Sequence, residues 1–589
     1  MIVYGAHAGR VAVADRLAEL RDAACRFTRS GAVDRELAAE LLIDAGELEA
    51  GVVDALTPHH DTVCAAERAC RAVSLSCGRI VHALRRGAGG AHGEAAALIH
   101  SLDRLAALPL PERVDVSVPE GYAYYAVYPE AYADAAERFA REHRPVLAVC
   151  VGIRSIGTSL SAGVAAALEA RGCDVRSYTV RPRGHPFDRR VSLGHALDAE
   201  LRALAGGDAP AHFLVVDEGP GLSGSSIASV AGALAATGVP DDRITLFPSW
   251  EPDPAGFRSE AARDRWGRHR KYSTSFERLW LDDGRLARAA GCDALTDLSG
   301  GAWRRVVFER AEDAPAVQPQ HERRKYLCGG VGQGRAGAWL LKFAGLGHYG
   351  RAAHSRAAQL ADAGFAPPAC GVVEGFLASR FVPGRPLAPA PDEGELPELL
   401  RVIADYLAHV ARTYPGERPL PYDELVEMVR VNTEEALGPE WGARVRRLDR
   451  LRDAVRHGAT TAIDGRMLPH EWIRTPGGRY LKTDAVDHHR DHFFPGHQDV
   501  AWDLAGSCVE FALSPGARDA LVGAYARRAR DAGVAARLPF YTVAYLAFRL
   551  GYCTLAAESI GGSRDGVGQR VLAARYARQL QEVLCSLPA

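Results

Sequence analysis

Long apolar runs and an N-terminal leader are both absent from this chain of 589 residues. A membrane-spanning helix needs about 18 consecutive apolar residues, and no stretch comes near that length. A signal peptide needs a charged segment followed by an apolar core, and the sequence does not open in this way. We therefore expect a cytoplasmic protein with neither a membrane span nor a signal peptide.

The chain also lacks an excess of charge of either sign. Its 71 lysine and arginine residues nearly balance its 73 aspartate and glutamate residues, so the formal net charge is -2. Without a bulk positive field, a protein has little general attraction for nucleic acid. We expect small-molecule substrates as partners, and neither nucleic acid nor a membrane. The sequence leaves the oligomeric state open.

The cysteines do not form clusters. Twelve cysteines are scattered along the chain, and the closest three are Cys64, Cys70 and Cys77. Their spacing fits no common zinc-binding pattern. We expect reduced thiols in helices and cores, as is usual for cytoplasmic proteins.

Lysine is scarce. Only four of the 71 basic residues are lysines: Lys271, Lys325, Lys342 and Lys482. The lysine ammonium is a compact point charge, whereas the arginine guanidinium is a broad planar fork. We therefore expect this chain to keep lysine where a compact cation is needed.

The length predicts two to four domains, each with its own core. The first 110 residues repeat apolar residues at helical spacing, whereas residues 145–250 alternate strand and helix patterns. Such alternation predicts an α/β fold with a parallel sheet and right-handed crossovers. A polar stretch with prolines near residue 315 predicts a linker. The expected parts are a helical N-terminal region (1–110), an α/β domain (111–300), a linker (301–321) and a second domain (322–589).

Residues 212–226 read HFLVVDEGPGLSGSS and form the most informative motif. The apolar run predicts a buried strand, with Asp217 and Glu218 at its carboxyl end, where open α/β sheets bind ligands. The glycine- and serine-rich loop then opens a helix, whose free N–H groups favour an anion. A nucleotide-binding domain of another kind is the alternative, although no G-x-G-x-x-G precedes the helix.

This motif resembles the phosphoribosyl-diphosphate (PRPP) motif of type I phosphoribosyltransferases. The resemblance implies a parallel-sheet α/β domain that transfers the phosphoribosyl group of PRPP to a small acceptor, such as a nucleobase, and releases pyrophosphate. It also implies that Asp217 and Glu218 hold the ribose, with Mg²⁺ at Asp217. The residues that would bind the 5′-phosphate are Gly221, Ser223, Gly224, Ser225 and Ser226.

A second loop follows the predicted strand at 146–151. It contains Gly152, Arg154, Ser155 and Thr158, which suit the pyrophosphate loop of that family because arginine binds two phosphate oxygens at once. We therefore place Arg154 with Asp217 and Glu218 among the catalytic residues.

The third segment of interest, residues 181–190, is rich in cations and includes Arg183. It resembles the mobile arm that covers PRPP in the family, and a solvated loop is the alternative. Residues 122–132 contain five tyrosines, which form either a packing cluster or an aromatic wall for a base.

The second half begins with residues 325–343, which read KYLCGGVGQGRAGAWLLKF. A glycine-rich hairpin here leads into an apolar strand that carries Lys342. The order of this strand, a helix, further strands and a hinge resembles the small lobe of the aminoglycoside-phosphotransferase branch of the protein-kinase-like α+β fold. The resemblance implies that Gly330, Gly332 and Gly334 cover ATP and that Lys342 binds its phosphates. The helix after Lys342 offers no glutamate to pair with it.

Two later stretches continue the resemblance. Residues 466–474 read RMLPHEWIR and residues 479–488 read RYLKTDAVDH. The resemblance implies a metal-binding role for Asp484, and either Asp499 or Asp503 would steady the catalytic loop. His470-Glu471-Trp472 lacks the aspartate base and the asparagine of the family. Either Glu471 acts as a base in the nucleotide site, or the loop is inactive.

Four histidines, His488, His489, His492 and His497, lie close together with two aspartates. We favour histidines that support the site or bind phosphate over a dedicated transition-metal centre.

Three hypotheses follow from the sequence. The first is phosphoribosyl transfer with Mg²⁺ and PRPP, coupled to an ATP-binding kinase-like domain. The second is a regulatory protein that senses PRPP and nucleotide without turnover. The third is a small-molecule kinase that acts through the C-terminal domain alone.

Overall fold

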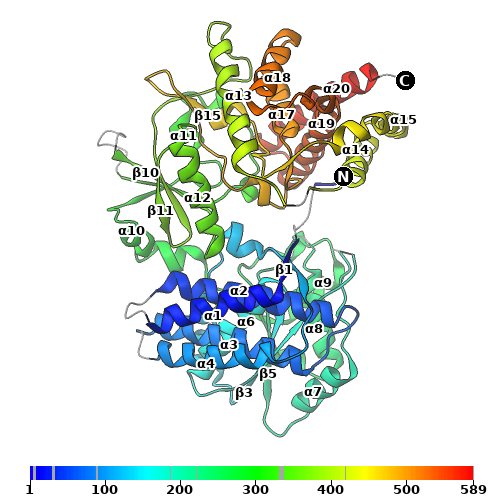
Figure 1. Cartoon of the computed structure of the whole chain (residues 1–589). Helices are drawn as coiled ribbons and strands as arrows, with labels where there is room; N and C mark the ends of the chain where they lie inside the picture. The colour runs from blue at the N-terminus through cyan, green and yellow to red at the C-terminus, as the bar shows by residue number, and fades with distance from the viewer. Residues whose placement is uncertain are drawn as a thin grey trace. The chain divides into compact units, whose positions relative to one another are not determined.

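The computed structural model describes residues 1–3, 8–29, 34–87, 90–185, 187–221, 223–329, 337–417 and 419–587 (Figure 1). The chain forms two compact units. Unit 1 comprises Met1–His7, Cys292–Ala344 and Arg351–Ala589, and unit 2 comprises Ala8–Gly291 and Gly345–Gly350. The helical N-terminal region and the α/β region therefore fall in one unit, which ends ahead of the expected linker.

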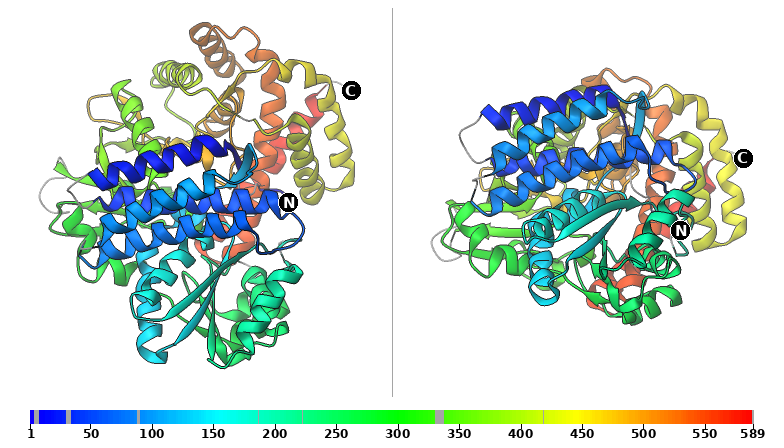
Figure 2. Two further views of the ribbon diagram at one scale, coloured as in Figure 1. Left: turned by 60° about the horizontal axis from the view of Figure 1, so that its bottom comes forward. Right: turned by 90° about the horizontal axis from the view of Figure 1, so that it is seen from below.

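The first part of unit 2 is a group of four helices. Its elements are β1 (Ala8–Ala12), α1 (Val13–Arg29), α2 (Arg35–Leu56), α3 (Ala65–Arg85), α4 (Ala91–Ala106) and β2 (Arg113–Ser117). The short strands β1 and β2 pair antiparallel. The helices share one core with Ala162 of α6 (Ile156–Glu169), and Figure 2 shows them lying along one another.

The second part of unit 2 is a five-stranded parallel sheet, as predicted. The strand order is β4 (Asp174–Val180), β3 (Leu147–Ile153), β5 (Ala211–Val216), β6 (Ile244–Phe247) and β7 (Arg270–Lys271). The core on one face of the sheet involves α7 (His195–Ala205), α8 (Ser225–Ala236) and α9 (Glu260–Arg268). The helix α6 packs on β3 and β4 and also contacts α5 (Pro129–His143). A short helix, α10 (Arg285–Ala289), ends the unit.

The sheet of unit 1 is antiparallel. Its order is β11 (Ala369–Val373), β12 (Phe376–Arg380), β10 (Trp339–Phe343), β9 (Lys325–Cys328) and β8 (Leu295–Asp297). The short helix α11 (Arg304–Val307) precedes β9, and α12 (His348–Asp362) follows β10. The predicted nucleotide-covering glycines, Gly330, Gly332 and Gly334, lie outside the described residues.

One disulfide departs from the expectation of reduced thiols. Cys292 and Cys328 are bonded, with their Cα atoms 5.7 Å apart, and the other ten cysteines are free. The two residues are 36 positions apart, so their local spacing gives no indication of the pair. Their contact depends on β8 pairing with β9.

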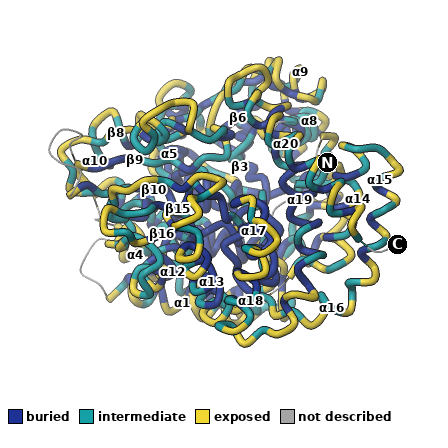
Figure 3. Tube along the Cα trace, turned by 90° about the horizontal axis from the view of Figure 1, so that it is seen from above, coloured by how far each residue is buried: buried dark blue, intermediate teal, exposed yellow. Residues whose placement is uncertain are grey.

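The rest of unit 1 is mainly helical. The helices are α13 (Leu396–Thr413), α14 (Tyr422–Leu437), α15 (Pro439–Arg444), α16 (Arg452–Arg456), α17 (Ala501–Glu510), α18 (Pro515–Ala529), α19 (Val534–Ile560) and α20 (Arg564–Ser586). The innermost are α17 and α19, which Figure 3 shows as mostly buried. None of the helices in the described part of the chain is long and apolar enough to cross a membrane.

Short strands connect these helices and shape the candidate site. The strand β15 (Trp472–Arg474) pairs with β16 (Tyr480–Lys482) and with β13 (Arg385–Pro386). The strand β14 (Thr460–Thr461) pairs with β17 (Gln498–Asp499). Two buried tryptophans, Trp472 and Trp502, belong to the core of this unit.

A substitution at the contact between α3 and α6 tests how tightly unit 2 is packed there. A Cβ atom on Gly78 would lie 2.5 Å from the carbonyl oxygen of Ala162, so Gly78→Ala forces a backbone to move. We expect this substitution to lower the free energy of unfolding by about 1–3 kcal/mol. Denaturant titration measures the change. The control is Gly163→Ala, where the new Cβ would meet only the Pro129 oxygen at 3.8 Å, and where stability should stay or rise.

Candidate functional site

The centre of the unit 1 site is an ion pair between Lys342 and Asp484. Lys342 lies on β10, and Asp484 follows β16 by two residues. The Nζ atom of Lys342 is 2.5 Å from Oδ1 of Asp484 and 3.4 Å from Oδ1 of Asp487. Burial acts to lower the pKa of Lys342, but the two carboxylates outweigh it and raise that pKa above its usual value. The pair therefore stays ionised inside the fold.

A tight loop places Asp464 next to this pair. Gly465 has φ +80°, a left-handed conformation that suits glycine, and it follows Asp464 directly. The carboxylate of Asp503, on α17, accepts hydrogen bonds from the backbone N–H groups of Asp464 at 2.8 Å and Gly465 at 2.7 Å. Of the two predicted loop-steadying aspartates, Asp503 therefore contacts the loop, whereas Asp499 pairs with Arg537 of α19 at 2.6 Å.

The buried Lys482 joins three parts of the site. Its side chain is fully buried, and Nζ donates to Oε2 of Glu471 at 2.9 Å and to Oδ1 of Asp464 at 3.4 Å. It also donates to the backbone carbonyl oxygen of Asp484. The other oxygen of Glu471, Oε1, lies 2.7 Å from Nε of Arg466. Protein cations thus contact both oxygens of Glu471, and the ammonium of Lys482 likewise contacts both oxygens of Asp464, at 3.4 and 3.2 Å.

His488 is the one of the four clustered histidines that lies between the acidic residues Asp464 and Asp484. Nδ1 is 3.3 Å from Oδ1 of Asp464, and Nε2 is 3.7 Å from Oδ1 of Asp484. Burial acts to lower its pKa, but the carboxylates, Asp484 first, outweigh burial and raise it. Ligand atoms from Glu471, Asp484 and His488 all lie within 4.8 Å of one another. Both Glu471 oxygens already contact Lys482 or Arg466, so Asp484 and His488 are the members of this set better placed to hold a divalent cation.

The other three histidines of that run have different neighbours. His489 lies 3.3 Å from a guanidinium nitrogen of Arg356, and the nearby cation and burial hold its pKa well below the usual value. His492 packs against the ring of Phe493, and His497 accepts from the backbone N–H of Glu417 at 3.0 Å. The histidine-rich run is therefore not a single metal centre.

The helix α12, which follows Lys342 and contains no glutamate to pair with it, carries Arg356. Its guanidinium donates to the carbonyl oxygens of Ala485 at 2.9 Å and Ala462 at 2.8 Å. These carbonyls adjoin Asp484 and the Asp464 loop, respectively. The helix thus holds both acidic residues through their backbones instead of pairing with the lysine.

In unit 2 the predicted loops after β3 and β5 lie side by side. The strands are hydrogen-bonded neighbours in register, with Gly152 opposite Val216. A Cβ atom on Gly157 would lie 2.6 Å from the carbonyl oxygen of Val216, so the two loops approach each other closely. The structure therefore brings the two predicted anion loops to one edge of the sheet.

The acidic pair of unit 2 is largely shielded from solvent. Burial raises the pKa of Asp217 to about 6 and raises that of Glu218 well above its usual value. Glu218 accepts a hydrogen bond from the N–H of Gly121 at 2.8 Å, and the hydroxyl of Tyr132 donates to the Asp217 carbonyl oxygen at 2.8 Å. These contacts fix the Glu218 side chain and the Asp217 backbone at the strand end.

The predicted phosphate loop opens α8 as expected. Gly224 has φ +65° and precedes the helix, and the hydroxyls of Ser223 and Ser225 are 3.0 Å apart. Gly221 is exposed, whereas Ser226 is half-buried. The loop therefore presents backbone and hydroxyl groups near Asp217.

The position of Arg154 does not agree with the prediction that it binds pyrophosphate. Its side chain is 1% exposed, and Nε donates to Oδ1 of Asp54 at 2.8 Å. Its other nitrogens donate to Asp61 and to the carbonyl oxygen of Thr179. A guanidinium enclosed by two carboxylates and a carbonyl is not available to pyrophosphate. Arg154 is a buried structural ion pair in this conformation.

The residues around Arg154 are also engaged in the fold. Thr158 is fully buried, and Gly152 packs so closely against Gly157 that a Cβ would clash at 2.4 Å. Arg183 donates to Asp61 at 3.1 Å but keeps 23% of its side chain exposed. Ser155 has φ 122° and lies half-buried just ahead of α6.

The tyrosine cluster is a packing cluster. Tyr122, Tyr124, Tyr128 and Tyr132 are each at most 4% exposed. Their faces are covered by the fold, so these four do not form an open aromatic wall.

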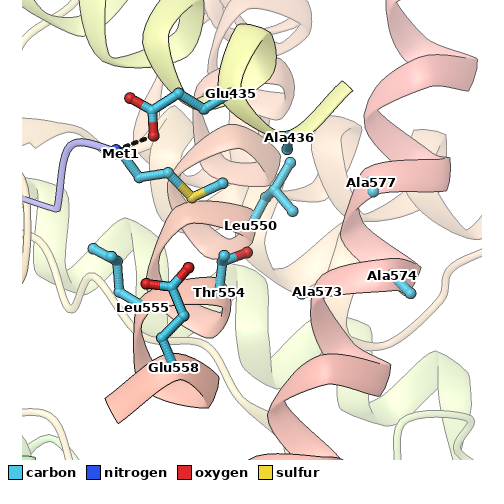
Figure 4. A pocket seen from close by; sticks show the side chains of 10 residues that line it. All are labelled: Met1, Glu435, Ala436, Leu550, Thr554, Leu555, Glu558, Ala573, Ala574 and Ala577. Carbon is cyan, nitrogen blue, oxygen red and sulfur yellow. Dashed lines mark hydrogen bonds and ion pairs between the residues drawn. The ribbon is translucent and has the colours of Figure 1, made fainter. Parts of the chain in front are cut away.

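A cavity of about 440 Å³ lies elsewhere in unit 1 (Figure 4). Seven of its ten lining residues are apolar, Leu550 and Ala577 among them, and Glu435, Thr554 and Glu558 add polar groups. The Met1 amino group forms an ion pair with Glu435. The cavity shares no lining residue with the Lys342–Asp484 site.

The chain matches no protein-family model and no curated protein. Among solved structures it is similar to choline kinase LicA from Streptococcus pneumoniae, with 14% identity over 44% of this chain and 89% of that one, and a TM-score of 0.33. A choline/ethanolamine kinase family protein from Mesorhizobium loti gives 16% identity, 45% and 89% coverage, and a TM-score of 0.33.

A thermostable mutant of aminoglycoside phosphotransferase APH(4)-Ia gives 15% identity over 51% of this chain and 97% of that one, with a TM-score of 0.33. These alignments cover about half of the chain.

Asp464, which the structure places beside Lys482 and His488, was not singled out in the sequence analysis. The signal that could have found it is the run Ala462-Ile463-Asp464-Gly465, an apolar pair followed by an aspartate and a turn glycine, ahead of the strand that leads to Asp484.

Asp503→Ala tests whether the loop of Asp464 and Gly465 depends on the two hydrogen bonds that it makes with the Asp503 carboxylate. The substitution leaves two buried N–H groups without partners, and each costs about 1–3 kcal/mol. We expect the free energy of unfolding of unit 1 to fall by about 2–4 kcal/mol, as measured by denaturant titration. The control is Asp519→Ala, which removes an exposed aspartate of α18 and should change stability little. Equal losses of stability in Asp503→Ala and Asp519→Ala would contradict the claim that the Asp503 carboxylate stabilises this loop.

Proposed function

We propose that unit 1 transfers the γ-phosphoryl group of ATP to a hydroxyl group of a small molecule. The observation that carries the proposal is the buried Lys342–Asp484 pair beside a loop aspartate held by Asp503. A strand lysine for phosphates, a carboxylate for a metal ion and a carboxylate near the acceptor are the parts that phosphoryl transfer needs.

Lys342 binds the ATP phosphates in this proposal. Its ammonium would exchange part of its contact with Asp484 for phosphate oxygens. Asp484, with His488 beside it, would hold Mg²⁺, which neutralises charge on the phosphates when bound. The mechanism then depends mainly on positioning and electrostatic stabilisation, since the phosphoryl transition state is loose.

Asp464 accepts the proton of the attacking hydroxyl. As that oxygen bonds to the γ-phosphorus, the bond to the bridging β–γ oxygen breaks and ADP leaves. Burial acts to raise the pKa of Asp464, but Lys482 and His488 outweigh it and keep the pKa below its usual value. The carboxylate is therefore ionised at neutral pH, and its Oδ2 accepts a hydrogen bond from the hydroxyl of Tyr406 at 2.6 Å.

The first test separates binding from transfer. Lys342→Met should weaken ATP binding with Mg²⁺ at least about tenfold, equal to about 1.4 kcal/mol, because a phosphate contact is lost. Asp464→Asn should keep ATP binding but abolish transfer to an acceptor found by screening hydroxyl compounds. Calorimetry measures binding, and ADP release measures transfer.

The matched control is Lys271→Met, which removes a lysine of unit 2. It should leave ATP binding unchanged. Unchanged ATP affinity in Lys342→Met would contradict the proposal.

We also propose that unit 2 binds PRPP with Mg²⁺ at Asp217 and Glu218. The loop after β5, which follows Asp217 and Glu218 and opens α8 with Ser223 and Ser225, supports this proposal. Phosphoribosyl transfer to a small acceptor is the enzymatic form of the proposal, and sensing of PRPP without turnover is the alternative. Release of pyrophosphate in an acceptor screen would distinguish the two.

The pH dependence of PRPP binding tests this second proposal. The raised pKa of Asp217, about 6, means that the carboxyl is protonated below pH 6 and ionised above it. Because Mg²⁺ binds the ionised form, affinity for PRPP with Mg²⁺ should rise between pH 5 and pH 7, while the Asp217→Asn variant should bind weakly at all pH values. Calorimetric titration across this range measures the change. A flat profile in the unaltered protein would contradict the role of Asp217.

A further inference from the structure

The ammonium of Lys482 lies in a set of oxygen ligands that resembles a metal site. All three of its N–H donors point to oxygens: the carboxylates of Asp464 and Glu471 and the main-chain carbonyl of Asp484. Carboxylates combined with a backbone carbonyl are the ligands that hard divalent cations prefer. The Lys482 side chain is fully buried.

The position of this set matters for phosphoryl transfer. In protein kinases two metal ions are held by the strand-end aspartate and by the catalytic-loop asparagine. Here Asp484 is that strand-end aspartate, and Glu471 follows the Asp464 loop. The Nζ atom of Lys482 is 2.9 Å from Oε2 of Glu471 and also contacts the carbonyl oxygen of Asp484, so the ammonium lies between these two residues.

The choice of lysine supports this interpretation. The chain uses arginine in all but four of its 71 basic positions, yet it has lysine here. A guanidinium is planar and broad, whereas an ammonium is a compact tetrahedral charge, closer in shape to a bound ion. A point charge fits between two carboxylates and a carbonyl where a planar fork does not.

The charges on the Glu471 side are already matched by protein cations. Asp464 and Glu471 contribute two negative charges, and Lys482 with Arg466 contributes two positive charges. A divalent ion added between them would meet an ammonium at short range. On the other side, Asp484 has Lys342 and His488 as neighbours and 18% of its side chain is exposed.

We propose that unit 1 binds nucleotide with a single divalent ion, on the Asp484 side, and that the fixed ammonium of Lys482 replaces a second ion. This inference rests on the proposed ATP site. It assigns Lys482 a positioning role, because the residue acts on Asp464 and Glu471 and not on the reacting atoms.

Ion counting tests the proposal directly. Unbound Mn²⁺ is measured by electron paramagnetic resonance in the presence of saturating AMP-PNP, a non-hydrolysable ATP analogue. We expect one Mn²⁺ per bound nucleotide in the unaltered protein and two in Lys482→Met, whose Asp464 and Glu471 carboxylates are left free to bind an ion. The control is Lys325→Met, which removes a lysine that is paired with Glu322 and does not contact Asp464 or Glu471. This variant should bind one Mn²⁺ per nucleotide, like the unaltered protein.

Two Mn²⁺ ions in the unaltered protein, or only one in Lys482→Met, would overturn the proposal. A second measurement needs no nucleotide: the Tm of each protein in rising Mn²⁺. Lys482→Met should be stabilised by Mn²⁺ more strongly than the unaltered protein and than Lys325→Met. The same response in all three proteins would overturn the role of Lys482.

The two measurements separate this inference from the proposed function. Failure of the unaltered protein to bind AMP-PNP would reject the ATP site, and the thermal measurement would still decide the role of Lys482. A Lys482→Met variant that folds only with Mn²⁺ supports the proposal. One that Mn²⁺ does not restore contradicts it.

Discussion

The structure of the candidate site in unit 1 depends on one constraint: each buried charged side chain needs a neighbouring group of opposite charge. Lys342, Lys482, Asp464 and Asp484 are charged groups that the fold removes from bulk water, and an isolated buried charge is strongly unfavourable. Each is therefore held within reach of an opposite charge. The same requirement fixes the geometry, because a carboxylate can stay ionised here only where a cation or hydrogen-bond donors contact it.

The backbone carries this arrangement as much as the side chains do. Asp503 holds the loop of Asp464 through two N–H groups, and Arg356 holds carbonyls next to both acidic residues. Buried helices, α17 among them, supply these anchors. In unit 2 a different constraint acts, since parallel pairing of β3 with β5 forces their following loops to one edge of the sheet. Both units thus use core elements to place loops that carry the polar groups.

The elements with strong local patterns could be predicted from the sequence. The apolar run before Asp217 predicted a buried parallel strand, and the alternation of patterns predicted the sheet of unit 2. Residues whose surroundings come from distant segments could not be predicted in this way. Arg154 looked like a phosphate ligand because its partners, Asp54 and Asp61, lie about 100 positions earlier.

The same reason applies to Asp464 in unit 1, whose neighbours come from distant segments: only the fold brings Asp503 to its loop. The scarce lysines are concentrated in one unit. Three of the four, Lys325, Lys342 and Lys482, lie in unit 1, and they form ion pairs with Glu322, Asp484 and Glu471, respectively.

This scarcity makes one measurement especially direct. An acyl-phosphate derivative of ATP acylates a lysine that lies beside its phosphates, and mass spectrometry then locates the modified residue among only four lysines. The account predicts acylation of Lys342 that excess ATP suppresses, with Lys271 of unit 2 as the internal reference. Absence of acylation at Lys342, or acylation that ATP does not reduce, would contradict an ATP site at the Lys342–Asp484 pair.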